Sequence, residues 1–139
     1  MIRAVVDTNL LLRMAAGEHR SPLFMAWREK RFALVLSAEM LDEFEDVMVR
    51  PRARRFLPPL RGQRFVTLLR ARALLVMPAC EFPSCRDSKD DVVVATAVAA
   101  CPCYLVTADR DLYDDVGLVT ALRDLEVYVA QAGEFLDGL

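Results

Sequence analysis

The stretch IRAVVDTNLLLRM, residues 2–14, contains the change of pattern that decides the fold. Residues 2–6 are mainly apolar and partly β-branched, which is typical of a buried strand. The polar corner Asp7, Thr8 and Asn9 follows directly, and the leucines after it begin a helix that we expect to end near Gly17. A buried strand that ends on an acid and continues into a helix is the opening unit of a parallel α/β fold.

The same alternation continues along the chain. Apolar runs predict further strands at 32–36, 74–77, 103–106 and 126–129. Cap and proline signals predict helices at 22–30, 38–49 and 88–100, one from residue 109, a short one at the end, and Arg-rich helical material over 51–73 that breaks at Pro58-Pro59. We therefore predict an α/β fold: a single domain over 1–139, with a mostly parallel central sheet of about five strands flanked by helices.

Composition excludes several classes of protein. A chain of 139 residues that is 55% hydrophobic and 27% charged is neither disordered nor collagen-like. The apolar run at the amino end is too short for a signal peptide, and residues 92–108 are too short and too interrupted to span a membrane. We expect a soluble, cytoplasmic protein with no membrane partner.

The cysteines and the single histidine do not predict a zinc site. The four cysteines form no C-x-x-C pair, and His19 is the only histidine. We interpret the cysteines as reduced, small apolar residues. A redox pair of Cys101 and Cys103 is the alternative.

Acidic residues occur where the fold would bring them together. Asp7 and Asp109 follow two predicted strands, and the carboxyl ends of parallel strands meet at one edge of a sheet. Either of them alone could be a helix N-cap. Glu43 lies along the border of the apolar stripe of its helix, and Asp90 lies on the line of Val93 and Ala97 in an almost wholly apolar helix. A carboxylate buried in such a place needs a partner.

Asp91 has a simpler explanation, because Ser88-x-x-Asp91 fits a capping box. Asp87 belongs to the preceding loop. The third acid of the site is therefore Asp90 or Asp91, and we prefer Asp90. Converging carboxylates repel one another by about 3 kcal/mol per close pair at an effective dielectric near 20. Without His or Cys ligands, an all-oxygen set suits Mg²⁺ or Mn²⁺, ions that serve phosphoryl chemistry.

Four motifs follow one another along the chain. They are Val5-Val6-Asp7-Thr8-Asn9, Ser37-x5-Glu43-Phe44 with Val49-Arg50-Pro51-Arg52 after it, Arg86-Asp87-x2-Asp90-Asp91, and Leu105-Val106-Thr107-Ala108-Asp109-Arg110-Asp111-Leu112. In this order they resemble the motifs of the PIN-domain ribonucleases, and particularly those of the toxin components of bacterial toxin–antitoxin systems, known as VapC-like toxins. Two departures are Ser88, where this branch often has Pro, and Ala108, where it often has Gly.

The resemblance implies a site for Mg²⁺ or Mn²⁺ and a role for each matching residue. Thr8, Asn9 and Thr107 would orient the site, while Asp87, Asp91 and Asp111 are supporting residues or alternative ligands. The residues implied to be both metal-binding and catalytic are Asp7, Glu43, Asp90 and Asp109.

An arginine-rich segment lies between Asp46 and Glu81, a stretch without any acid. Arginine binds phosphate in bidentate pairs, and phosphate contacts supply most non-specific affinity for nucleic acids. We expect Arg50, Arg52, Arg54 and Arg55 to contact nucleic acid; the alternative is a solvated helix. Phe56 and Phe65 could stack on bases, but we expect both in the core.

The leading hypothesis is a metal-dependent endoribonuclease that hydrolyses RNA with an activated water. The resemblance implies 5′-phosphate and 3′-hydroxyl products, a toxin role, a cognate antitoxin and a homodimer or higher oligomer. One alternative is a PIN-type nuclease in RNA processing or flap DNA cleavage without a toxin role. Another is a non-catalytic nucleic-acid-binding module. Phosphotransfer through an aspartyl-phosphate is weakly supported, because Asn9 stands where such enzymes need a second Asp.

Overall fold

The computed structural model describes residues 1–139 and contains a five-stranded, wholly parallel sheet. The strands are β1 (Arg3–Val6), β2 (Ala33–Leu36), β3 (Leu74–Leu75), β4 (Cys103–Val106) and β5 (Val127–Ala130), in the order β3-β2-β1-β4-β5. In the central register, Val5 lies opposite Val35 on one side and Leu105 on the other. All three are fully buried, as expected for a parallel sheet covered on both faces. The α/β fold predicted from the sequence is confirmed.

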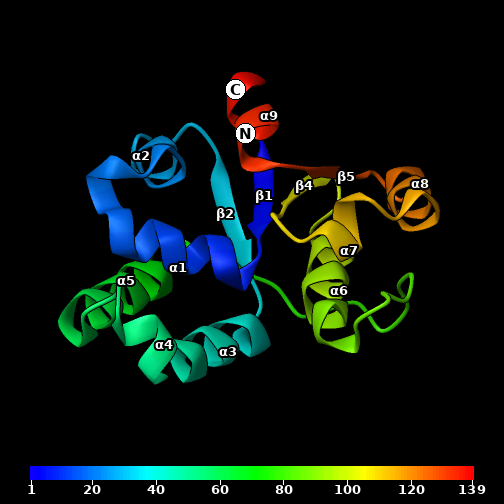
Figure 1. Cartoon of the computed structure of the whole chain (residues 1–139). Coiled ribbons are helices and arrows are strands. Elements are labelled where there is room, and N and C mark those ends of the chain that lie inside the picture. Colours follow the sequence, from blue (N-terminus) through cyan, green and yellow to red (C-terminus); the bar gives the residue numbers. More distant parts are fainter.

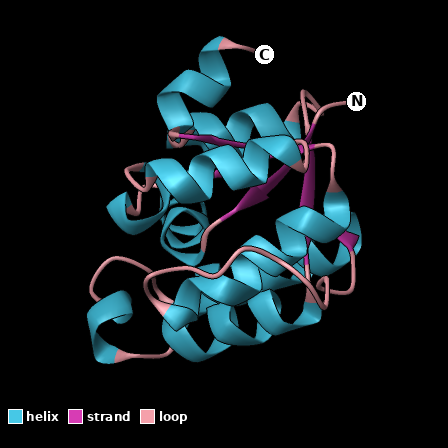
Figure 2. Ribbon diagram, turned by 90° about the vertical axis from the view of Figure 1, so that its right-hand side faces the viewer, coloured by secondary structure: helices cyan, strands magenta, loops and turns pink.

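Helices cover both faces of the sheet (Figures 1 and 2). Helix α6 packs across β1, β2 and β4, whereas α9 packs against β4 and α2. Helices α1, α3 and α5 pack against one another beside the sheet. The helices are α1 (Thr8–Gly17), α2 (Pro22–Arg28), α3 (Ala38–Met48), α4 (Pro51–Arg54), α5 (Pro59–Arg72), α6 (Asp91–Ala100), α7 (Arg110–Tyr113), α8 (Val116–Asp124) and α9 (Ala132–Asp137), with 3-10 turns η1 (Glu18–Arg20) and η2 (Ser88–Asp90).

The arginine-rich segment is attached to the core by aromatic side chains. The ring of Phe65 on α5 lies 5.4 Å from that of Phe44 on α3 and 6.0 Å from that of Trp27 on α2, measured between centroids. Phe65 is buried, as predicted. The prediction for Phe56 is wrong, because 48% of its surface is exposed. Helix α4 ends just before Phe56, and the turn directs the next residue, Leu57, into the core instead.

Three local predictions differ from the structure. The third strand ends at Leu75 rather than residue 77, because its partner β2 ends at Leu36. The helix predicted from residue 109 is two helices, since Asp115 starts a new one by accepting a hydrogen bond from the backbone N–H of Leu118.

The capping box of Ser88 and Asp91 is also absent. Asp87 is the cap and accepts from the N–H of Lys89, because the chain first makes a 3-10 turn. Asp91 instead accepts a hydrogen bond from the N–H of Cys85 at 3.0 Å.

Both termini lie at one end of the molecule (Figures 1 and 2). The chain ends at Leu139, beside the start of the strands. The carbonyl oxygen of Leu139 lies 3.5 Å from the guanidinium of Arg31, which comes just before β2. Helices α3 and α4 lie at the opposite end, toward which β1 and β2 run (Figure 1). None of the helices has the length and apolar character needed to cross a membrane.

Candidate functional site

The strand order places two acids next to each other at the edge of the sheet. The order reverses between β1 and β4, so the segments that follow these two strands diverge and leave a crevice at their carboxyl ends. Asp7 immediately follows β1, and Asp109 follows β4 after Thr107 and Ala108. The pairing of Val6 with Val106 holds the two strand ends level.

Asp7 is held rigidly by three donors. It is 8% exposed and is the N-cap of α1, where its Oδ1 accepts from the N–H of Leu10 at 2.9 Å. Its Oδ2 accepts from the hydroxyl of Thr107 and from the N–H of Ala108 at 3.2 Å. The N-cap reading and the site reading of Asp7 are therefore compatible, because one oxygen caps the helix and the other faces β4.

Thr107 connects two of the acids. Its side chain is fully buried, and its hydroxyl donates to Asp7 while it accepts from the N–H of Asp109 at 3.0 Å. Asp109 in turn caps α7 by accepting from the N–H of Asp111 at 2.9 Å. Thr107 thus fixes the position of Asp7 relative to the backbone of Asp109, which is an orienting role of the kind that the resemblance implies.

Glu43 is brought to the site by α3, which begins at the cap Ser37 directly after β2. The Glu43 side chain is half-buried, and its Oε2 accepts a hydrogen bond from the hydroxyl of Thr8 at 3.2 Å. Thr8 and Asp7 are consecutive, so this contact links the second acid to the first. Asn9 is exposed and lines the same pocket.

Asp90 is the acid with the least compensation. One of its oxygens, Oδ2, is buried without any hydrogen-bond partner. The pKa of Asp90 is raised to about 7, first by burial, then by the neighbouring carboxyl group of Asp109, and then by the charges of Asp87 and Asp111. The structure therefore leaves a buried oxygen and excess negative charge at this point, which is the environment that attracts a cation.

The four acids line one pocket of about 590 Å³. Asp91 and Asp111 do not line it, and Thr107 lies behind its wall. The sequence analysis missed the charged lining residues Arg13 and Lys89, and it expected Phe56, which also lines the pocket, in the core. The lining residues are Asp7, Thr8, Asn9, Leu12, Arg13, Glu43, Val47, Arg50, Arg52, Ala53, Phe56, Asp87, Lys89, Asp90, Val93 and Asp109.

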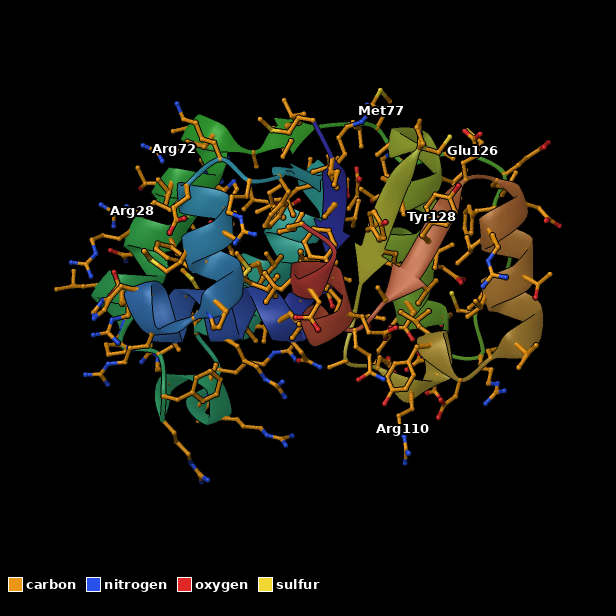
Figure 3. All side chains as sticks on the ribbon, turned by 90° about the horizontal axis from the view of Figure 1, so that it is seen from above. Arg28, Arg72, Met77, Arg110, Glu126 and Tyr128 are labelled. Carbon is orange, nitrogen blue, oxygen red and sulfur yellow. The ribbon has the colours of Figure 1, made fainter.

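The arginines of the segment between Asp46 and Glu81 divide into two groups, those in ion pairs and those without an ion pair. Arg61 and Arg64 form ion pairs with Glu18, and Arg70 pairs with Glu45. Arg50, Arg52, Arg54, Arg55 and Arg72 form no ion pair, but only Arg50 and Arg52 line the pocket. The side chains of Arg28 and Arg72 extend outward from α2 and α5, and that of Arg110 points away from the molecule (Figure 3).

A divalent ion suits the oxygen donors of this pocket, although the carboxylates do not lie close enough together to bind one. The donors are carboxylate oxygens, which suit Mg²⁺ and Mn²⁺, and Asp90 Oδ2 is a buried oxygen in need of a partner. No three Asp, Glu, His or Cys side chains are grouped closely enough to hold an ion as they stand. Asp7 and Glu43 are instead engaged by threonine hydroxyls.

The cysteines take no part in the pocket. All four are free thiols. Cys103 faces α6, where its thiol donates to the carbonyl of Ala97 at 3.2 Å, and burial raises its pKa to about 12. A thiol that stays protonated at neutral pH is a poor nucleophile, so the structure favours the interpretation of Cys103 as an apolar core residue.

A parallel sheet with acids gathered at its switch point defines an α/β domain whose site lies where the strands end. The chain was compared with protein families, and the PIN domain family matches residues 3–111, a range that contains all four acids. The chain therefore belongs to the PIN-domain family, whose members are generally nucleases that use divalent metal ions. No curated protein matches the chain.

Proposed function

We propose that this protein is a metal-dependent endoribonuclease that hydrolyses phosphodiester bonds at the pocket of Asp7, Glu43, Asp90 and Asp109. One observation carries the proposal: these four carboxylates, spread over the sequence, line a single pocket in which Asp90 has a buried oxygen without a partner. Nothing in the core requires four acids at one place, and their mutual repulsion opposes folding. A cation is the natural compensation.

The residues of the chain divide the work. Asp7, Glu43, Asp90 and Asp109 would hold Mg²⁺ or Mn²⁺. When bound, such an ion would lower the pKa of the attacking water and neutralise the charge of the phosphate. Thr107 keeps Asp7 in place with its buried hydroxyl, and Thr8 does the same for Glu43. Asn9 is an exposed amide at the pocket and is available to orient substrate or water.

The cations of the pocket support a polyanionic substrate. Arg13, Arg50, Arg52 and Lys89 line the same walls as the acids, so phosphates on either side of the cleaved bond would find partners. An aspartyl-phosphate mechanism gains no support, because Asp7 is occupied by three donors rather than free for attack.

Cleavage assays with defined ions test this proposal. Purified protein is incubated with single-stranded RNA in Mg²⁺, in Mn²⁺, in Zn²⁺ and in EDTA, and with flap DNA in parallel. We expect cleavage in Mg²⁺ or Mn²⁺ only, with 5′-phosphate ends. Asp109→Asn keeps the capping oxygen and should be inactive, whereas Asp124→Asn, on the exposed end of α8, should be as active as the parent. Full activity in EDTA, or equal activity of the Asp109→Asn preparation, would disprove metal-dependent chemistry at this pocket.

We further propose that the protein is the toxin of a toxin–antitoxin pair. Its expected partners are the antitoxin and further copies of the chain, in a homodimer or higher oligomer. The support is the resemblance of its motifs to those of VapC-like toxins. Induced expression should arrest growth, and co-expression of the neighbouring gene product should relieve the arrest. Light scattering of the purified protein measures whether it is a dimer. An active nuclease that is harmless on induction would favour a role in RNA processing or flap cleavage instead.

A further inference from the structure

Phe56 is the exception among the phenylalanines of this protein. Of the seven in the sequence, five are buried and Phe82 packs against the core, whereas Phe56 is 48% exposed. It contributes to none of the aromatic pairs, which join the five buried phenylalanines, Trp27 and two tyrosines. A single exposed apolar residue is common on protein surfaces. The position of this one is what matters.

The backbone holds Phe56 in its exposed position. Its N–H donates to the carbonyl of Ala53 at 3.1 Å, and the N–H of Leu57 donates to the same carbonyl at 2.9 Å. Ala53 and Leu57 are both buried, so the turn is fixed at two points in the core. The backbone at Phe56 is therefore held in an ordered turn, so little backbone entropy is lost when a ligand contacts the ring.

The ring faces the pocket of the four acids. Phe56 lines that pocket together with Arg50 and Arg52, which belong to the same short segment around α4. A pocket of about 590 Å³ is larger than an ion needs and falls in the range of small-molecule sites. Its walls thus present cations for phosphates, acids for the ion and an aromatic face, the three features that a nucleotide can use at once.

We propose, on the basis of the proposed nuclease function, that Phe56 stacks on an unpaired base beside the cleaved phosphate. In a duplex the faces of the bases are covered by their neighbours, so the ring has nothing to stack on. In a single strand a base can turn toward the ring while Arg50 and Arg52 hold the adjoining phosphates. Stacking does not distinguish one base from another, so Phe56 contributes affinity for unpaired bases without selecting a sequence.

The test measures binding without cleavage. Labelled single-stranded RNA of mixed sequence, and the same strand in a duplex, are titrated with protein in EDTA, and a gel checks that the RNA stays intact. Phe56→Ala should weaken single-strand binding by roughly 5- to 100-fold, the range for loss of one stacked base. Duplex binding should not change, and Phe56→Trp should restore single-strand binding. Leu60→Ala is the matched control, because Leu60 is 76% exposed nearby on α5 and lies outside the pocket.

A spectroscopic measurement separates stacking from general contact. The fluorescence of 2-aminopurine in the strand should be quenched by the parent protein and not by Phe56→Ala. Equal losses for single strand and duplex, or unchanged quenching in Phe56→Ala, would overturn the inference. Because binding is measured in EDTA, it does not depend on catalysis. If the parent protein cleaves RNA but Phe56→Ala binds single strands as well as the parent does, the proposed function stands and this inference is wrong. If Phe56→Ala binds single strands more weakly but the parent cleaves no RNA, this inference stands and the proposed function is wrong.

Discussion

Asp90 and Asp109 line the same pocket, and Asp109 contributes more than any other neighbouring residue to the raised pKa of Asp90. Asp109 follows β4 and caps α7, so its position is fixed by the backbone. Asp90 stands at the start of α6 with one oxygen buried and without a partner. Burial and three neighbouring carboxylates oppose the ionisation of Asp90. Its raised pKa makes the metal-free site dependent on pH.

Asp90→Asn should stabilise the metal-free protein at alkaline pH. The folded pKa of about 7 lies above the usual 3.8, so the folded state binds the proton more tightly, and stability declines as the pH rises from about 4 through 7. Asn removes the charge and keeps the shape. Allowing for solvent screening of this half-exposed group, we expect a gain of about 1–2 kcal/mol at pH 8, or roughly 3–8 °C in melting temperature.

Thermal melts in EDTA at pH 5 and pH 8 measure this effect, and the gain should be small at pH 5. Asp91→Asn is the control, one residue further along. It loses a charge next to the N-terminus of α6 and should cost a few tenths to 1 kcal/mol. A loss for Asp90→Asn and a gain for Asp91→Asn would move the third acid of the site to Asp91.

Binding of Mg²⁺ should release a proton near neutral pH. Metal ligands must be deprotonated, and at pH 6 Asp90 is mostly protonated in the metal-free protein. Affinity should therefore rise between pH 6 and pH 8 and level off above. Calorimetry in buffers of different ionisation enthalpy counts the protons, with close to one expected at pH 6. Asp90→Asn should bind the ion more weakly and release none; a parent whose affinity does not vary with pH contradicts the prediction.

Thr107→Val should loosen the acidic pocket while keeping its shape. Valine removes one donor to Asp7 Oδ2 and the acceptor for the N–H of Asp109, and both groups are in a largely buried place. An unsatisfied buried polar group costs about 1–3 kcal/mol. Thr107→Ser keeps the hydroxyl and should retain Mg²⁺ affinity, although it loses a methyl group. If the two variants have equal Mg²⁺ affinity in calorimetry, the hydroxyl does not orient the site.

The pocket arginines should act differently from those beside them. Replacing Arg50 and Arg52 with Ala removes the same charge as replacing Arg54 and Arg55, but only the first pair lines the pocket. The slope of log affinity for single-stranded RNA against log salt should fall by about 1.4 for the first pair, or 0.7 per lost phosphate contact. The second pair should change it less and leave cleavage intact. If the two double variants lower the slope equally, the four arginines act only through their summed positive charge and not through contacts in the pocket.

The sequence was most informative where local rules and the fold agree. Apolar runs ending on Asp7 and Asp109 predicted both strands and the approach of the two acids, because parallel strands must end at the same edge. The phase of Asp90 relative to Val93 also agrees with the structure, in which both line the pocket. These are properties of periodicity, which a single sequence displays directly.

The errors arose where a side chain had two local options. Asp91 could accept a hydrogen bond from the backbone N–H of Ser88 or from another donor. Because the chain makes a 3-10 turn over Ser88–Asp90, Asp91 accepts from the N–H of Cys85 instead. Phe56 or Leu57 could enter the core after α4, and the turn fixed by Ala53 selects Leu57. Arg13 was overlooked, although its spacing of four from Asn9 places both on one face of α1.

The adjacency of β1 and β4 also means that the pocket is divided between two halves of the chain. Asp7 and Glu43 precede the irregular segment 76–87, and Asp90 and Asp109 follow it. A chain cut at exposed Met77 would leave each half with two acids and a strand whose partner lies in the other half. If the proposed function holds, neither fragment alone would bind the ion or cleave RNA, and nuclease activity would return only on reassociation. The protein could thus serve as a split reporter, in which catalysis records the meeting of two fused partners.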